Sequence, residues 1–318
     1  WGDALNLPGA VADLATKTLS FDVAGMVGVT TISAEVSDGT DSVMASVPVN
    51  ILASAPVLAV DVDSDGDGIS DADEGYGDSD GDGIPDYADN IVVPNAAPSD
   101  GGVVETEPGT QITLGSLSLA NGDNDISVAE DDLVELGIEP DADYDYPSGL
   151  IDFTVSGAEP GASYNLVVPL AISIPANSEY RKYFNDNIGW QAFTEDASNA
   201  IASATGVDGA CPDLESDAYV SGVNAGDNCL RLTIKDGGPN DVDMSENGTV
   251  VDPSGIATFG DGTAPVITLL GDATVTIEVG NAYVDAGASA EDAVDGDITA
   301  SITTDSSVDV DTVGTYTV

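Results

Sequence analysis

The 318-residue sequence contains no histidine and only 5 Lys and Arg residues, against 58 Asp and Glu residues. The absence of histidine removes the commonest general base, so we do not expect an enzyme. The formal charge of −53 excludes nucleic acids and anionic membrane surfaces as partners, because both are negatively charged. Aromatic residues make up 5% of the chain, which is few for a sugar-cleaving cleft. We therefore expect cations or neutral molecules as partners.

Cysteine is also scarce. The two cysteines, Cys211 and Cys229, are predicted to form a disulfide because the rest of the chain has an extracellular character; two free thiols are the alternative. The sequence shows no secretion signal, transmembrane run or lipid motif, and no membrane insertion is expected. Because it starts at Trp1 without methionine and stops on a strand-like segment, we expect a processed or excised piece of a longer chain.

The most distinctive stretch is residues 61–90, DVDSDGDGISDADEGYGDSDGDGIPDYADN. Its twelve carboxylates have no Lys or Arg among them, so an ordered form needs cations to neutralise their repulsion. Hard oxygen ligands in this number suit Ca²⁺ better than Mg²⁺ or Zn²⁺. The alternative is an acidic, disordered linker.

The ligand register of a twelve-residue calcium loop occurs here twice, fifteen residues apart. The first loop is Asp63–Glu74 and the second loop is Asp78–Asp89, with Gly68 and Gly83 at the sharp turns. Flanking amphipathic helices are missing, so a helix-loop-helix hand is not expected. The predicted ligands, which include the carbonyl groups of two isoleucines, are Asp61, Asp63, Asp65, Asp67, Ile69, Asp71, Asp73, Glu74, Asp78, Asp80, Asp82, Ile84, Asp86 and Asp89. These DxDxDGxxD repeats resemble thrombospondin type 3 repeats, which implies calcium ions wrapped with little regular secondary structure.

The overall composition, with 36 Gly, 16 Pro and many Val, Thr, Ile and Ser residues, is typical of a β-rich protein with frequent turns. We predict an all-β fold in which tandem β-sandwich (Ig-like) modules are joined by the irregular calcium-binding acidic repeat. The predicted domains are 1–58, 59–92, 93–260 and 261–318.

Residues 1–58 resemble part of a bacterial Ig-like or cadherin-like module. The segment 5–19 is expected to be irregular or weakly helical. Period-two alternation then predicts strands at 19–23, 30–37 and 43–52.

In residues 93–260 we expect strands in 103–120, on both sides of a Pro-Gly turn. Further strands are expected at 150–157, 163–174, 181–186, 189–193, 229–237 and 248–253. The segment 194–228 is expected to be a long loop. The runs FTVSGAEPGASYNLVVPL and CLRLTIKDGGPNDVDMSENGTVVDPSGIA resemble the bacterial domain called choice-of-anchor U. This resemblance implies an exported bacterial surface protein and implies no enzymatic activity.

Three groups of residues in this domain each have two interpretations. A further calcium site or a polar loop with Asx turns is expected at Asp236, Asn240, Asp241, Asp243 and Asp252. Internal ion pairs, or a basic ligand patch as the alternative, are expected at Arg181, Lys182, Arg231 and Lys235. Core positions, or else a platform for sugars, are expected at Tyr180, Tyr183, Phe184 and Trp190.

Residues 261–318 contain APVITLLGDATVTIEVGNAYVDAGASAEDAVDGDITASITT and GTYTV, and they resemble a bacterial Ig-like module of the type first described in a pesticidal crystal protein. The resemblance implies a small Greek-key sandwich with strands at 266–271, 274–280, 282–287, 288–292, 298–304 and 314–318. Calcium ligands at one end of that sandwich, or ordinary loop acids, are expected at Asp261, Asp292, Asp295 and Asp297.

β-Modules joined by calcium-stiffened segments form a rod, because calcium removes the self-repulsion of the acidic repeat. We therefore predict an extracellular, calcium-stabilised structural or adhesive protein of a bacterial cell surface, or a secreted one. Its expected partners are calcium ions, further copies of the chain, other surface proteins or glycans. We further hypothesise a filament subunit, in which the N-terminal segment or the final strand completes a sheet of the next subunit. The alternative is a non-catalytic spacer or glycan-binding region of a larger secreted enzyme.

Overall fold

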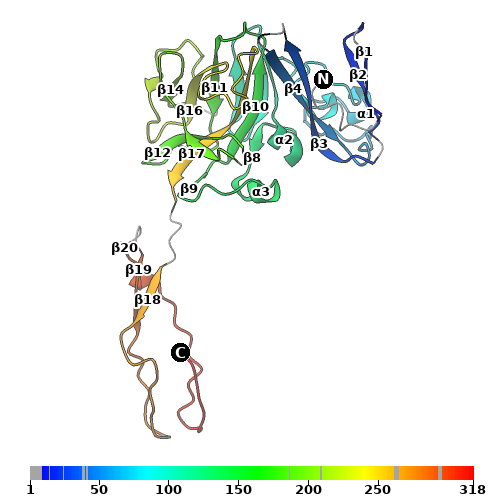
Figure 1. The fold of residues 1–318 in the computed structure, drawn as a ribbon. Coiled ribbons are helices and arrows are strands. Elements are labelled where there is room, and N and C mark those ends of the chain that lie inside the picture. Colours follow the sequence, from blue (N-terminus) through cyan, green and yellow to red (C-terminus); the bar gives the residue numbers. More distant parts are fainter. Residues whose placement is uncertain are drawn as a thin grey trace. The chain divides into compact units, whose positions relative to one another are not determined.

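The computed structural model describes residues 9–13, 15–23, 25–37, 40, 42–185, 187–207, 210–260, 265–292 and 296–318. Antiparallel strands dominate the fold, and the helices are short (Figure 1). The chain divides into two compact units, one comprising 1–141 with 145–259 and the other comprising 142–144 with 260–318. The all-β prediction is therefore confirmed.

The first sheet of the larger unit has seven strands and is built around β17, its longest strand. Its order is β13-β12-β17-β10-β7, while β8 pairs with β10 and β9 pairs with β17. The strands are β7 (Gln111–Leu114), β8 (Ser127–Val128), β9 (Tyr144–Asp145), β10 (Leu150–Ser156), β12 (Ser178–Tyr183), β13 (Trp190–Ala192) and β17 (Thr249–Phe259).

The second sheet has six strands in the order β15-β14-β16-β11-β6-β5. The strands are β5 (Ala96–Ser99), β6 (Gly102–Thr106), β11 (Ser163–Pro169), β14 (Ala200–Ala204), β15 (Val220–Ser221) and β16 (Cys229–Lys235). Alternate residues of both sheets meet in one apolar core, for example Phe153 and Val155 of β10 with Leu166 of β11 and Leu232 of β16. All four are fully buried, as the period-two pattern of a β-sandwich requires.

Two hairpins form in the N-terminal part of the larger unit. β1 (Val11–Asp13) pairs with β2 (Thr18–Ser20), and β3 (Gly28–Ser37) pairs with β4 (Ser42–Ile51). The expectation of an irregular or helical segment over 5–19 is wrong for its described part, because a hairpin forms there around Lys17 with φ of 57°. The β3–β4 hairpin is held to the sandwich by Asn50, which donates to the Leu119 carbonyl over 2.9 Å.

One predicted strand segment is a helix. Residues 116–120 lie in α2 (Ser116–Asn121), which starts after Gly115 and ends at Gly122 in the left-handed region. The buried carboxylate of Asp152 accepts the Leu117 amide over 2.6 Å and the Ser118 amide over 2.9 Å, which satisfies the first turn of the helix. This distant acceptor explains why local strand propensity does not decide the segment.

The predicted loop 194–228 contains two strands, β14 and β15, at the edge of the second sheet. Only one residue of β14, Ile201, is β-branched, so its small residues give a weak strand signal. Full pairing with β16, from Ala200↔Thr233 to Ala204↔Cys229, overrides that weak propensity.

The smaller unit has a three-stranded sheet of β18 (Val266–Leu269), β19 (Ala288–Asp292) and β20 (Gly296–Asp297), followed by a 3₁₀ helix, η3 (Thr299–Ser301). Strands were also expected at 274–280, 282–287, 298–304 and 314–318, and the described residues form none there. Val275, Ile277 and Val279 are 55%, 39% and 56% exposed, so no facing sheet covers these side chains.

Short helices complete the fold. α3 (Glu130–Glu135) follows β8, while α1 (Asp71–Glu74) and the 3₁₀ helix η2 (Asp86–Ala88) lie in the acidic repeat. Among the described residues, no helix combines the length and apolar character needed to cross a bilayer.

Candidate calcium sites

The two acidic loops have the same backbone turn. In the first loop, Asp63 accepts hydrogen bonds from the amides of Gly66 and Gly68, over 2.8 and 3.1 Å. In the second loop, Asp78 accepts the equivalent bonds from Gly81 and Gly83, over 2.7 and 3.2 Å. These turns need glycine, because Gly68 and Gly83 have φ of 96° and 100°.

The ninth loop position closes each turn in the same way. Asp71 accepts both the amide and the hydroxyl of Ser64, each over 2.9 Å. Asp86 accepts the amide and hydroxyl of Ser79 over 2.7 and 3.0 Å. These two aspartates also begin α1 and η2, so the fifteen-residue sequence repeat is a structural repeat.

The carboxylates at the first, third and fifth loop positions converge. Ligand oxygens of Asp63, Asp65 and Asp67 lie within 4.8 Å of one another, as do those of the second group, Asp78, Asp80 and Asp82. One oxygen of Asp82 accepts the Ile84 amide over 2.7 Å, and one oxygen of Asp80 accepts the Asp82 amide over 3.3 Å. The first loop has the same pair of bonds, from Ile69 to Asp67 and from Asp67 to Asp65.

Four buried carboxylate oxygens in the loops have no hydrogen-bond partner in the described part of the chain. They are Oδ2 of Asp65, Oε2 of Glu74, Oδ2 of Asp80 and Oδ2 of Asp82. A buried, unpartnered carboxylate oxygen is costly, whereas a bound cation would satisfy it. These residues occupy the third, fifth or twelfth loop positions, so they fit the oxygen set of a calcium loop.

Burial and mutual repulsion disfavour the charged forms of these groups. Burial raises the pKa of Asp82 to about 7 and that of Asp89 to about 6, and neighbouring loop carboxylates add to both effects. Burial likewise raises the pKa of Asp65, Glu74 and Asp80. A divalent cation would remove the repulsion and favour the ionised ligands.

The second loop is built into the sandwich. Ile84 is fully buried in the main core, and the Leu114 amide of β7 donates to the Asp82 carbonyl over 2.8 Å. The side-chain amide of Gln111 donates to the Gly81 and Asp80 carbonyls over 2.7 and 3.2 Å. Sequence reasoning missed Gln111, because no local pattern pairs it with a loop thirty residues away.

The first loop is more exposed and rests on the second loop. Ile69, which corresponds to Ile84, is 50% exposed. The side-chain amide of Asn90 donates to the Asp65 carbonyl over 3.0 Å, and Tyr76 meets Tyr87 edge to face with ring centroids 6.2 Å apart. The two loops therefore form one continuous acidic segment.

The remaining predicted ligands of the repeat lie outside the two converging groups. Asp61 and Asp73 are exposed, and Asp73 accepts the Ser70 hydroxyl over 2.9 Å. Asp89 is buried and accepts the Ile91 amide over 2.8 Å. Their part in binding stays a prediction, as does that of the carbonyl groups of Ile69 and Ile84.

The acids at 236–252 are buried for the most part, but they serve mainly as acceptors for backbone amides. Asp236 accepts the amides of Gly161 and Gly248, each over 2.7 Å. Asp241 accepts the amides of Gly237 and Val251, over 2.8 and 3.0 Å. Asn240 accepts the Thr194 amide and Asp243 accepts the Asn247 side-chain amide. Asp252 contacts Lys182.

In the smaller unit, Asp292 is buried and Asp297 accepts the Thr299 amide over 3.0 Å. Asp261 and Asp295, which we also predicted as ligands, lie outside the described residues. The calcium prediction for this unit therefore stays a prediction.

Three of the four cations are confirmed in ion pairs. Arg181 contacts Asp141 and Glu179, each at 2.6 Å, Lys182 contacts Asp252 at 2.8 Å, and Lys235 contacts Glu246 at 2.9 Å. Arg231 differs, because its guanidinium lies over the ring of Tyr219 and donates to the Leu214 and Ser216 carbonyls.

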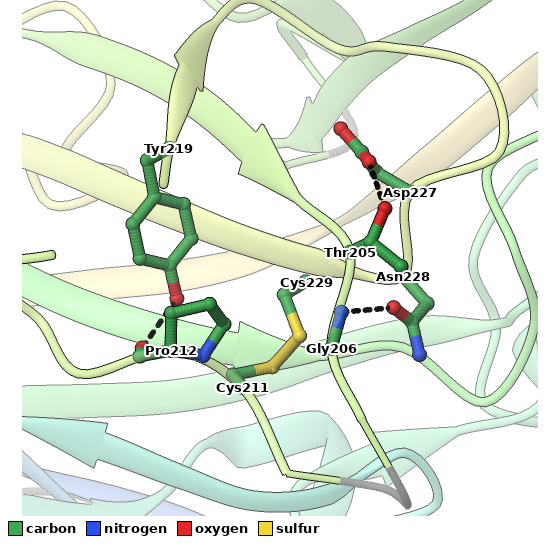
Figure 2. Close-up of a disulfide and its surroundings, with 8 residues drawn as sticks. All are labelled: Thr205, Gly206, Cys211, Pro212, Tyr219, Asp227, Asn228 and Cys229. Carbon is green, nitrogen blue, oxygen red and sulfur yellow. Dashed lines mark hydrogen bonds between the residues drawn. A yellow bond between two sulfur atoms is a disulfide. The ribbon is translucent and has the colours of Figure 1, made fainter. Parts of the chain in front are cut away.

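The predicted disulfide between Cys211 and Cys229 is confirmed (Figure 2). It ties the connection that follows β14 to the start of β16. Beside it, the Tyr219 hydroxyl donates to the Pro212 carbonyl over 2.8 Å, and the Gly206 amide donates to the Asn228 side chain over 2.7 Å (Figure 2).

The four aromatic residues considered as a sugar platform do not form an exposed row. Tyr180 and Tyr183 are buried, while Phe184 and Trp190 are half-buried. The Trp190 ring packs against Tyr146 and Tyr183, with centroid separations of 4.5 and 5.3 Å, and its indole N–H donates to the Glu139 carbonyl. This arrangement favours a core role over a sugar platform.

The fold and these loops define an all-β protein that carries a repeated, carboxylate-rich loop on a disulfide-bonded sandwich. Residues 267–318 match the family described as "Bacterial surface protein, Ig-like domain". No curated protein and no solved structure matches the chain. The family match indicates a surface-associated bacterial protein, and together with the all-β fold it favours a non-catalytic role.

Proposed function

We propose that this chain is an extracellular, calcium-stabilised structural or adhesive component of a bacterial surface. The observation that carries the proposal is the set of four buried, unpartnered carboxylate oxygens at ligand positions of two equivalent loops. The Ig-like match at 267–318 supports the surface location.

In this proposal each loop holds one calcium ion through its converging aspartates. Asp63, Asp65, Asp67 and Glu74 would hold the ion of the first loop. Asp78, Asp80, Asp82 and Asp89 would hold that of the second. The ion supplies charge neutralisation and rigid geometry. Extracellular calcium modules bind with dissociation constants of about 10⁻⁴ to 10⁻³ M, which suits a surface exposed to millimolar calcium.

Calcium binding at the second loop should stabilise the sandwich as well as the loop. The buried Ile84 side chain and the Leu114 amide connect that loop to the core. Anything that binds the folded loop and not the unfolded chain raises the stability of the whole cooperative unit. The acidic repeat would then be a stiff, load-resistant part of the surface protein.

The proposal also includes assembly into a filament by strand addition. Among the described strands, β3 and β4 pair only with each other, so each ten-residue strand has one edge without a β partner. Such edges are templates for a strand from another chain. Electron microscopy with calcium should show filaments, and monomers at all concentrations would rule out this part alone.

The central test is a calcium titration by calorimetry combined with thermal unfolding in calcium and in EDTA. We expect at least two sites and a melting temperature that falls in EDTA. The variant D80N/D82N should lose one site, whereas E135Q, which removes an exposed charge from α3 outside the acidic repeat, should keep both. Unchanged melting in EDTA and no binding heat would contradict the calcium proposal.

The second candidate function is a spacer or glycan-binding region of a larger secreted enzyme. The feature that favours it is Trp190, an aromatic residue that is only half-buried. Binding to a glycan array that is lost in W190A, with unchanged folding, would support this alternative.

A further inference from the structure

A lysine and an aspartate face each other inside the sandwich core. Lys182 on β12 and Asp252 on β17 have side-chain exposures of 1% and 0%. In the β12–β17 pairing Lys182 lies opposite Ser254, so Asp252 is its diagonal neighbour on the same inward face. Lys182 Nζ lies 2.8 Å from Asp252 Oδ2.

This pair lacks the contacts that a stable buried ion pair requires. Although the distance is short, the geometry is not that of a hydrogen bond. Neither Lys182 Nζ nor either carboxylate oxygen of Asp252 has a hydrogen-bond partner among the described residues. A buried ion pair offsets its desolvation cost only when additional hydrogen bonds satisfy the remaining protons and lone pairs. Here they are missing.

We propose that Lys182 Nζ and Asp252 Cγ are joined by an intramolecular amide bond that links β12 to β17. The bond would replace two buried charges by one neutral amide. It would also account for two buried polar groups that lie 2.8 Å apart and have no hydrogen-bond partner among the described residues.

The reaction is a condensation that needs no oxidant or cofactor. A proton first moves from the Lys182 ammonium to the Asp252 carboxylate, which gives a neutral amine and a carboxylic acid. The amine lone pair attacks Cγ, so the C–N bond forms and one C–O bond breaks. The departing oxygen leaves as water, carrying the carboxyl proton and one proton from the amine.

The surroundings favour each step. Burial lowers the pKa of Lys182, which favours the nucleophilic neutral amine. Fixed contact between the reacting groups replaces a bimolecular encounter, and the dry core removes the water that would hydrolyse the product. Asp241, a fully buried carboxyl group whose oxygens accept the Gly237 and Val251 amides, also interacts electrostatically with Lys182.

The bond would complement the disulfide. Cys211–Cys229 ties the second sheet, whereas Lys182–Asp252 would tie β12 to the central strand of the first. The covalent loop from 182 to 252 would contain the whole disulfide loop. Each sheet of the sandwich would then contain a covalent cross-link that resists unfolding under mechanical force.

The first experiment is the intact mass of the denatured, reduced protein. We expect a mass lower than that of the sequence by one water molecule. Peptide mapping should find the peptide with Lys182 joined to the peptide with Asp252. A mass equal to that of the sequence would overturn the proposal and leave a simple ion pair.

Two variants make the test specific. D252N should form the same bond with loss of ammonia, so its final mass should equal that of the cross-linked wild type. K182R should keep the positive charge but show no mass deficit. The matched control is K235R, which alters the half-exposed Lys235–Glu246 pair of similar distance, 2.9 Å, and should retain the deficit. A deficit that persists in K182R would contradict the assignment.

Discussion

The first and second acidic loops have the same sequence register and the same turn, yet they differ in their relation to the core. Ile69 of the first loop is 50% exposed, whereas Ile84 of the second loop is fully buried. Both loops turn their first aspartate toward two glycine amides, and both close on a serine. The loop motif therefore defines the local cation geometry, while the neighbouring residues determine whether that geometry is coupled to folding.

The coupling comes from β7 and from the residues that follow the loops. Leu114 and Gln111 bind the second loop through its carbonyl groups. The first loop has instead the Asn90 contact and the Tyr76–Tyr87 ring pair, both of which join it to the second loop. We therefore expect stability to depend strongly on the second loop and weakly on the first.

The largest expected difference is between two isoleucine truncations. I84A removes a buried core side chain and should lower the free energy of unfolding by about 2 to 5 kcal/mol. I69A removes a half-exposed side chain and should cost less than about 1 kcal/mol. Urea denaturation in saturating calcium measures both. Equal losses would show that the two loops are equally coupled to the core.

Calcium should act in the same order. At a calcium concentration near 100 times the dissociation constant, binding stabilises the folded state by about 2.7 kcal/mol. D82N should remove most of that increment from the sandwich transition, and the equivalent D67N should remove little. Thermal unfolding with and without calcium measures the increment for each variant.

In EDTA we expect D82N to have the opposite effect on stability. D82N removes a buried carboxyl group whose charge has no counterion, so it should raise the melting temperature of the calcium-free protein. D67N should change it little, because Asp67 is exposed. A lower melting temperature of D82N in EDTA would indicate that Asp82 has a structural role other than cation binding.

The calcium-free protein should become less stable as pH rises from about 4 to 7. The pKa values of Asp82 and Asp89 are raised in the folded state, to about 7 and about 6, above the ordinary value of 3.8. Between those values the folded state binds more protons than the unfolded state, so the free energy of unfolding falls with pH.

Calcium should weaken this pH dependence, because a bound cation favours the ionised ligands. Unfolding by urea at several pH values, in EDTA and in calcium, tests both the pH dependence and its weakening by calcium. D82N/D89N should make the profile in EDTA shallower. Part of the slope should remain, because burial also raises the pKa of Asp152 to about 6 and that of Asp241 to about 7. A profile that rises with pH in EDTA would contradict the buried, unpartnered state of these carboxylates.

The smallest expected effect concerns the contact between Gln111 and the second loop. Q111A removes two hydrogen bonds to loop carbonyls and should cost about 1 kcal/mol. N90A removes one exposed bond to the first loop and should cost less. Urea denaturation at a fixed calcium concentration measures the loss of unfolding free energy in each variant. A larger loss in N90A than in Q111A would contradict the stronger coupling of the second loop.

Much of the site follows from local spacing. The alternating aspartates and the glycine at the sixth position predict converging oxygens, since backbone turn and ligand register are both short-range properties. The strand at 150–157 and the long strand that begins near 248 follow from period-two alternation in the same way. The disulfide follows from composition and cysteine count.

The rest depends on contacts between distant residues. Ile69 and Ile84 occupy equivalent positions, and no local pattern distinguishes the buried one from the exposed one. α2 forms where strands were expected because Asp152, far along the chain, accepts its first amides. The facing of Lys182 and Asp252 likewise requires the β12–β17 register, which single-sequence patterns do not provide.

The placement of the five basic residues has a consequence for digestion by proteases that cut after Lys or Arg. Arg181, Lys182, Arg231 and Lys235 lie on strands and are at most half-exposed, whereas Lys17 lies exposed in the β1–β2 turn. Cleavage concentrates at exposed turns and spares paired strands. Such a protease should therefore clip the native chain once, near its start, and leave the sandwich whole.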